Sequence, residues 1–222
     1  MPQSTLPDIR AVVFDLDGLM LNTEDIFDQA GKQLLARRGM EMTPEIHHAM
    51  LGRRPAEAIE AMKRLTGITD SNESLFTETR QLFAAIAETS LAMMPGLIEL
   101  LDQIDGAGHP KAVATSSPRD YMTSMLQRFE LLSRFRFTLT AEDVTHGKPH
   151  PEIYLTAAEM LKVSPANMLV LEDSETGTRA AAAAGAFVVS VPNRHTAVGD
   201  FSMASMQAAS LADAALGALF AR

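Results

Sequence analysis

Short apolar runs alternate with amphipathic segments along most of the chain. The runs lie at residues 11–15, 111–115, 136–140, 168–171 and 187–191. Such runs are typical of strands that are covered on both faces, as in a parallel sheet. Helical patterns separate them at residues 96–104, 118–129, 151–161 and 175–184. This alternation predicts βαβ units and an α/β fold, a Rossmann-like, doubly wound parallel sheet.

Residues 23–93 break the alternation, because they show helical periodicity and no strand pattern. We therefore predict an all-helical cap domain over residues 20–92, inserted after the first strand. The core domain then comprises residues 1–19 and 93–222. Within it, residues 204–222 are predicted to form one peripheral helix.

Composition narrows the class of protein. The chain has 222 residues, of which 46% are hydrophobic and 21% charged, as in an ordinary soluble domain. A net charge of −9 argues against a nucleic-acid partner, and the absence of cysteine excludes disulfides and thiolate chemistry. No apolar run reaches the ~18 residues that span a bilayer, so no membrane partner is expected. The N-terminus lacks a hydrophobic signal region, which predicts a cytoplasmic location.

Polar residues stand where several predicted strands end. In open α/β sheets, ligands bind at the carboxyl ends of the strands. The residues at these ends, and in the loop before the helix at 151–161, are Asp15, Asp17, Thr115, Ser116, Lys148, Glu172 and Asp173. Asp15 and Asp17 are two apart in extended backbone, so their side chains are expected to point the same way.

This set of residue types is suited to phosphate chemistry. Clustered carboxylates repel one another, and Mg²⁺ removes that repulsion while binding phosphate oxygens. A helix start at Pro118, capped by Ser117 with Asp120, would offer free N–H groups to an anion. Uncatalysed phosphate-monoester hydrolysis needs acceleration by up to ~10²¹-fold. A general base typically supplies only ~10²–10⁴. A carboxylate nucleophile assisted by Mg²⁺ is the better match.

Four ordered motifs resemble those of the haloacid dehalogenase superfamily, in its β-phosphoglucomutase/phosphatase-like branch. They are Asp15-Leu16-Asp17-Gly18, Thr115-Ser116, Lys148-Pro149 and Glu172-Asp173-Ser174. The helical insert after the first motif resembles that family's first-position cap. The resemblance implies that Asp15 is the nucleophile and forms an aspartyl-phosphate. It implies that Asp17 is the general acid and base and contributes its backbone carbonyl to the metal.

The same resemblance assigns roles to the remaining motif residues. Asp173 is expected to ligate Mg²⁺ together with Asp15, with Glu172 either ligating or supporting a ligand. Thr115 and Lys148 are expected to hold the phosphoryl oxygens, and Ser116 to do so through its backbone N–H.

Several positions depart from the mutase pattern of this branch. An ungapped count places Phe27 where mutases carry a His and Pro55 where they carry an Arg. The other departures are Pro118-Arg119 after the second motif and Asn22 in place of an Asp. A mutase needs extra cationic contacts to hold a bisphosphate, so these departures favour hydrolysis.

We therefore expect a Mg²⁺-dependent phosphatase that acts on a small phosphorylated metabolite, such as a sugar phosphate. A β-phosphoglucomutase-type mutase is the alternative, and a catalytically idle metabolite-binding protein is a third. Arg53 and Arg54, in a loop between predicted cap helices, are expected to include a contact with the leaving group. The substrate's identity and the oligomeric state do not follow from the sequence.

Overall fold

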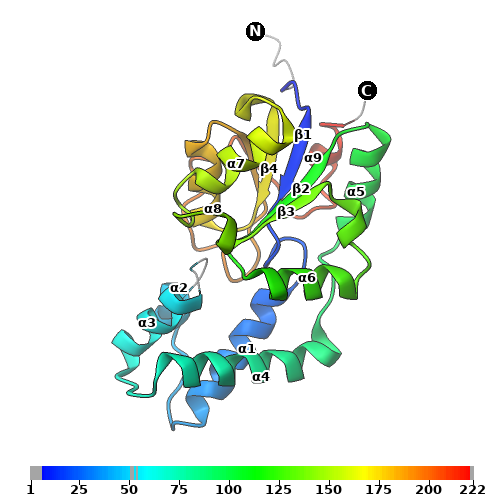
Figure 1. Ribbon diagram of the computed structural model, residues 1–222. Helices are drawn as coiled ribbons and strands as arrows, with labels where there is room; N and C mark the ends of the chain where they lie inside the picture. The colour runs from blue at the N-terminus through cyan, green and yellow to red at the C-terminus, as the bar shows by residue number, and fades with distance from the viewer. Residues whose placement is uncertain (1–6, 51–52, 54, 221–222) are drawn as a thin grey trace.

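A six-stranded parallel sheet forms the centre of the protein (Figure 1). The structure is a computed structural model, and it describes residues 7–50, 53 and 55–220. The strands are β1 (Ala11–Phe14), β2 (Lys111–Ala114), β3 (Phe137–Leu139), β4 (Met168–Glu172), β5 (Phe187–Ser190) and β6 (Met206–Gln207). Their order across the sheet is β3-β2-β1-β4-β5-β6. The predicted α/β fold is confirmed.

Helices cover both faces of this sheet, as expected of a doubly wound fold. They are α5 (Leu97–Gly106), α6 (Arg119–Arg128), α7 (Glu152–Leu161) and α8 (Glu175–Ala183). Alternate residues of β1 point to opposite faces. Val12 and Phe14 belong to the buried cluster that α5 and α6 complete, and Ala11 and Val13 belong to the one completed by α7 and α8. This double burial explains why the strand is apolar throughout.

Four helices lie together beyond the carboxyl ends of the strands, at the bottom of Figure 1. They are α1 (Thr23–Ala36), α2 (Pro44–Met50), α3 (Pro55–Thr66) and α4 (Asn72–Ser90). They share a hydrophobic cluster of their own, with Leu34, Ile59, Met62 and Leu75 buried in it. The division of the chain into core and cap at residues 20–92 stays a prediction.

Two chain crossings join these helices to the sheet, and they are hydrogen-bonded to each other. Leu21 and Met93 form an antiparallel bridge. The Asn22 amide donates to the carbonyl of Ser90 at 3.0 Å and accepts from the backbone N–H of Ala92 at 2.7 Å. Asn22, one of the departures from the branch pattern, thus links the segment that leaves the sheet to the segment that returns to it.

The prediction of one helix over residues 204–222 is wrong. Within the described part of that segment, β6 pairs in parallel with β5, Val189 standing opposite Met206, and only Ala214–Gly217 form a helix, α9. Asp213 caps α9 by accepting from the N–H of Ala215 at 2.9 Å. Without β6 this edge of β5 would leave backbone groups unpaired, and pairing with them outweighs the helix propensity of the alanines.

Candidate active site

A buried lysine joins the ends of two neighbouring strands. Lys148 Nζ lies 2.5 Å from Asp15 Oδ1, just after β1, and 2.5 Å from Glu172 Oε1, at the end of β4. It also donates to the carbonyl of Ala114 at 3.0 Å. The Lys148 side chain is 4% exposed and that of Glu172 is fully buried. Attraction to two carboxylates and three short contacts hold the ammonium group in a fixed position away from water.

Asp173 completes a group of three buried acids. Ligand oxygens of Asp15, Glu172 and Asp173 lie within 4.8 Å of one another. Burial raises the pKa of Asp15 to about 7, against the opposing effect of Lys148. Burial, followed by the charges of Asp15 and Glu172, raises the pKa of Asp173 well above its usual value. Ionising both groups therefore calls for further positive charge, and a set of hard oxygen donors suits a divalent cation such as Mg²⁺.

Asp17 lies beside these acids with both carboxylate oxygens hydrogen-bonded. Ser117 Oγ donates to Asp17 Oδ2 at 2.6 Å, and Thr115 Oγ1 donates to the same oxygen at 3.3 Å. The Tyr121 hydroxyl donates to Asp17 Oδ1 at 2.9 Å. Thr115 and Ser117 follow β2 and Tyr121 lies on α6, so these donors fix the orientation of Asp17 beside Asp15, which follows β1.

The predicted capping of α6 by Ser117 is wrong. The helix begins at Arg119, and Pro118 is its extended N-cap residue without a side-chain cap. Ser117 stands one residue too far back, and its hydroxyl donates to Asp17 instead. The Arg119 N–H is accepted by the Glu142 carboxylate at 3.1 and 3.2 Å. A carboxylate thus already lies at this helix end, which removes the predicted anion site there.

One cavity of about 610 Å³ connects these groups to the helices of the cap side. Asp15, Asp17, Lys148 and Asp173 line one end, and residues of α1, α3 and α4 line the other. Thr115 and Ser116 also line it, whereas Glu172 lies behind Lys148 and Asp173.

Of the two arginines predicted to contact the leaving group, the structure describes one. Arg53 lines the cavity and is exposed. Arg54 lies outside the described residues.

Glu24, in the first turn of α1, was not among the residues predicted from the sequence. It lines the cavity, and its pKa is raised to about 8, first by burial and then by the charges of Asp17 and Asp15. No residue spacing pointed to it, because its approach depends on how α1 leaves the sheet.

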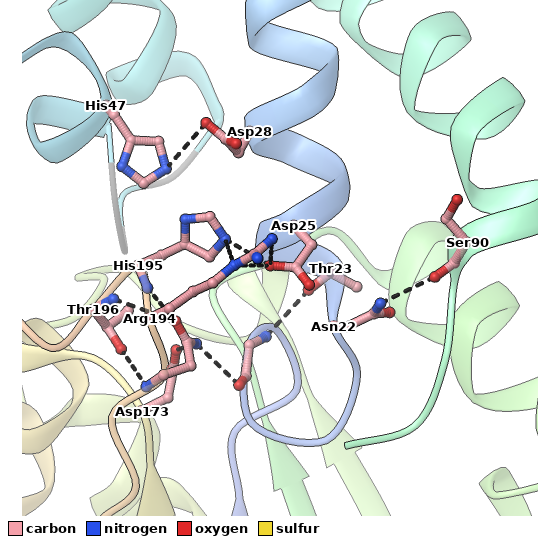
Figure 2. Close-up of polar contacts among 12 residues, drawn as sticks. Asn22, Thr23, Asp25, Asp28, His47, Ser90, Asp173, Arg194, His195 and Thr196 are labelled. Atoms are coloured by element: carbon pink, nitrogen blue, oxygen red, sulfur yellow. Dashed lines mark hydrogen bonds and ion pairs between the residues drawn. The ribbon is translucent and has the colours of Figure 1, made fainter. Parts of the chain in front are cut away.

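Asn193 was also missed, although it follows β5 and the rule on strand ends would have found it. Its amide donates to Asp173 Oδ2 at 2.8 Å and to the carbonyl of Gly18 at 3.1 Å. Figure 2 shows the same short loop in contact with α1. There Arg194 Nε and His195 Nε2 lie 2.9 and 2.6 Å from Asp25 Oδ1. One loop therefore fixes an acid of the buried group and the first helix of the cap side.

The chain is similar to known hydrolases in both sequence and structure. Residues 12–191 match the family model of haloacid dehalogenase-like hydrolases. The chain is 34% identical over 189 residues to validoxylamine A 7'-phosphate phosphatase of Streptomyces hygroscopicus subsp. limoneus, covering 85% of this chain and 88% of that protein. It is 30% identical over 177 residues to the phosphorylated carbohydrates phosphatase of Thermotoga maritima, covering 80% and 82%.

A solved structure shares the whole architecture. CbbY from Rhodobacter sphaeroides, in complex with phosphate, superposes with a TM-score of 0.80 at 27% identity, over 92% of this chain and 95% of that one. The family match and the phosphatases among these relatives identify the protein as a phosphoric monoester hydrolase. The chain belongs to the haloacid dehalogenase-like hydrolase family. No helix among the described residues is both long and apolar enough to cross a membrane.

Proposed function

We propose that the protein is a Mg²⁺-dependent phosphatase that hydrolyses a small phosphomonoester through an aspartyl-phosphate on Asp15. The observation that carries this proposal is the position of Asp15, whose carboxylate lies within 4.8 Å of Glu172 and Asp173 oxygens and also lines the cavity. Asp15, Asp173 and the Asp17 backbone carbonyl would hold the ion, with Glu172 ligating or supporting. The bound ion would neutralise charge on the phosphoryl oxygens.

The chemistry assigns each step to a residue of this chain. The Asp15 carboxylate attacks phosphorus, and the bond to the alcohol oxygen breaks. Asp17 gives its proton to that oxygen, so the alcohol leaves neutral. Asp17 then takes a proton from water as the water oxygen attacks phosphorus, which releases phosphate and restores Asp15. Thr115, Ser116 and Lys148 are placed around the phosphoryl group in this proposal.

The hydrogen bonds to Asp17 support its role as the base that activates water. With both oxygens held by Ser117, Thr115 and Tyr121, the carboxyl group keeps one orientation when it is charged. Losing one of these donors should reduce turnover without removing the nucleophile.

The relatives named above indicate the first substrates to test, since one is a phosphatase of validoxylamine A 7'-phosphate and another a phosphatase of phosphorylated carbohydrates. We propose a sugar phosphate or similar metabolite as substrate and Arg53 as a contact to its leaving group from the cap side. Hydrolysis is preferred over the mutase reaction because Phe27, which lines the cavity, stands where an ungapped count places the His of mutases.

A phosphate-release screen over phosphorylated metabolites tests the proposal. We expect release from at least one ester with Mg²⁺, no release after chelation by EDTA, and recovery when Mg²⁺ is added back. Full activity in EDTA, or no release from any ester, would contradict it.

Mg²⁺ should also stabilise the fold, because it binds the folded chain and neutralises buried acids. At about 100 times its dissociation constant, the gain is about 2.7 kcal/mol. Thermal unfolding with and without Mg²⁺ measures this gain. We expect the gain to be lost in Asp173→Asn and kept in Asp102→Asn, a matched change of an exposed acid on α5. An equal gain in both variants would place the ion elsewhere.

A further inference from the structure

Two histidines and a glutamate come together in the segment that carries Lys148. His146 Nδ1 lies 2.9 Å from Glu152 Oε2, and His150 Nδ1 lies 3.7 Å from the same oxygen. The ligand atoms of all three side chains lie within 4.8 Å of one another. None of these three residues lines the cavity. This His/Glu group (His146, His150 and Glu152) is therefore separate from the three buried acids of the candidate active site.

The spacing of the ligand atoms suits one tetrahedral metal ion. Zn²⁺ binds imidazole nitrogen and carboxylate oxygen at about 2.0–2.2 Å, which sets neighbouring ligand atoms roughly 3.4 Å apart. The observed nitrogen-to-oxygen distances of 2.9 and 3.7 Å lie on either side of this value. An ion between the three side chains would therefore need only small side-chain rotations.

The loop backbone holds these ligands in place. The N–H groups of Thr145 and His146 donate to Glu152 Oε1 and Oε2 at 2.7 and 2.9 Å, which fixes the carboxylate. These bonds, together with the His146 ring, lower the pKa of Glu152 to about 2, so this group is charged at neutral pH. His150 Nδ1 accepts from the Glu152 N–H at 3.3 Å, so it carries the lone pair that a metal ligand needs.

The donor types select the ion. Imidazole nitrogen suits Zn²⁺, Ni²⁺ and Cu²⁺, whereas Mg²⁺ prefers oxygen ligands. The side chains of His146 and His150 are 63% and 51% exposed, so an ion can enter from solvent and water can fill the remaining position. Three protein ligands and one water are a coordination that Zn²⁺ adopts. The His/Glu group therefore fits Zn²⁺ and not the ion proposed for the buried acids.

We propose that His146, His150 and Glu152 bind one Zn²⁺ ion at a second metal site, distinct from the proposed Mg²⁺ site. The ion takes the place of the proton between His146 Nδ1 and Glu152 Oε2, and this proton passes to solvent. The ion links His146 to the first residue of α7, and these two ligands lie on either side of Lys148 in the chain. Zn²⁺ should therefore close the loop around this lysine and stabilise the folded chain.

Zn²⁺ binding to the Asp173→Asn protein tests the site, because this change removes a ligand assigned to the other metal. Titration calorimetry of the metal-stripped protein in excess Mg²⁺ should show one equivalent of Zn²⁺ bound. We expect His146→Gln and His150→Gln, each added to this variant, to raise the dissociation constant at least about tenfold, since each removes one of three ligands.

His48→Gln is the matched control, because this exposed histidine on α2 lies outside the His/Glu group. It should leave the dissociation constant for Zn²⁺ unchanged. Two further measurements report on the site itself. X-ray absorption at the zinc edge should show nitrogen ligands at about 2.0–2.1 Å. Zn²⁺ should also raise the midpoint of thermal unfolding of Asp173→Asn, and His146→Gln should remove this rise.

The proposal is overturned if the Asp173→Asn protein binds no Zn²⁺, or binds it equally well after both histidine changes. A loss in His48→Gln as large as in His146→Gln also overturns it, because the ion would then bind surface histidines without a defined site. None of these measurements uses phosphate release, so their outcome is independent of the phosphatase proposal.

Discussion

Asp15→Asn is expected to abolish phosphate release, lowering kcat by at least about 10⁴-fold, while the protein stays folded. An amide of the same shape cannot attack phosphorus as a carboxylate does. The fold should tolerate the change because Lys148 keeps Glu172 as its partner at 2.5 Å. Steady-state phosphate release measures the loss. Acid-quenched wild-type enzyme should carry phosphate on the peptide that contains Asp15.

Asp102→Asn is the matched control, because this acid on α5 is 64% exposed and pairs with Arg134 away from the cavity lining; it should retain full activity. Wild-type turnover in Asp15→Asn, or phosphate trapped on a different residue, would refute the assignment of the nucleophile.

The same variant should alter how stability depends on pH in the ion-free protein. Burial raises the folded-state pKa of Asp15 from 3.8 to about 7, so the folded state binds this proton more tightly than the unfolded state. Stability from this group is therefore present below pH ~4 and is lost as the pH rises toward about 7. Asp15→Asn lacks this loss, so its stability relative to wild type should improve between those values. Denaturant unfolding at pH 5 and pH 8 in EDTA measures the difference.

Lys148→Met is expected to have the largest effect on stability. It leaves the buried carboxylates of Asp15 and Glu172 without their cation, and removing one member of a buried pair costs about 3–5 kcal/mol. For a domain of this size the midpoint of thermal unfolding should fall by roughly 10 °C. The loss should be largest near pH 8 and smaller near pH 5, because Lys148 lowers the pKa of Asp15 and its removal lets that acid take up a proton more readily.

Phosphate release by Lys148→Met should fall by at least about 10²-fold even at a temperature where the variant is folded. Lys63→Met on α3 is the matched control, since this lysine is half-buried and donates to the neutral side chain of Asn72 at 2.9 Å. Its stability should change by no more than about 0.5 kcal/mol. A Lys148→Met protein as stable and active as this control would show that the buried contacts carry neither role.

The sequence located the site through a local rule. Parallel strands bring their carboxyl ends to one edge, so the residues after β1, β2 and β4 could be grouped before any contact was known. Asp15, Asp17, Thr115 and Asp173 were found in this way, and the structure brings them together around one cavity. Their catalytic roles rest on the resemblance and on the experiments above.

Contacts across long sequence separations could not be found in this way. Lys148 and Asp15 are 133 residues apart, and Tyr121 and Asp17 are 104 apart. Ser117 fitted a capping pattern, but its hydroxyl donates to the Asp17 carboxylate and does not cap the helix. Local periodicity records which face of an element is buried, but not which side chain from another element meets it.

The sequence by itself determined the parallel sheet, the helical segment after the first strand and the acids at the strand ends, because strand and helix periods are local properties of the chain. Only the tertiary structure decided the pairing of β6, the buried position of Lys148 between two acids, the approach of Glu24, and the contacts of Phe27 with the rings of Phe83 and Tyr121. Each of these depends on the packing of elements distant in sequence, where burial and charge act through space.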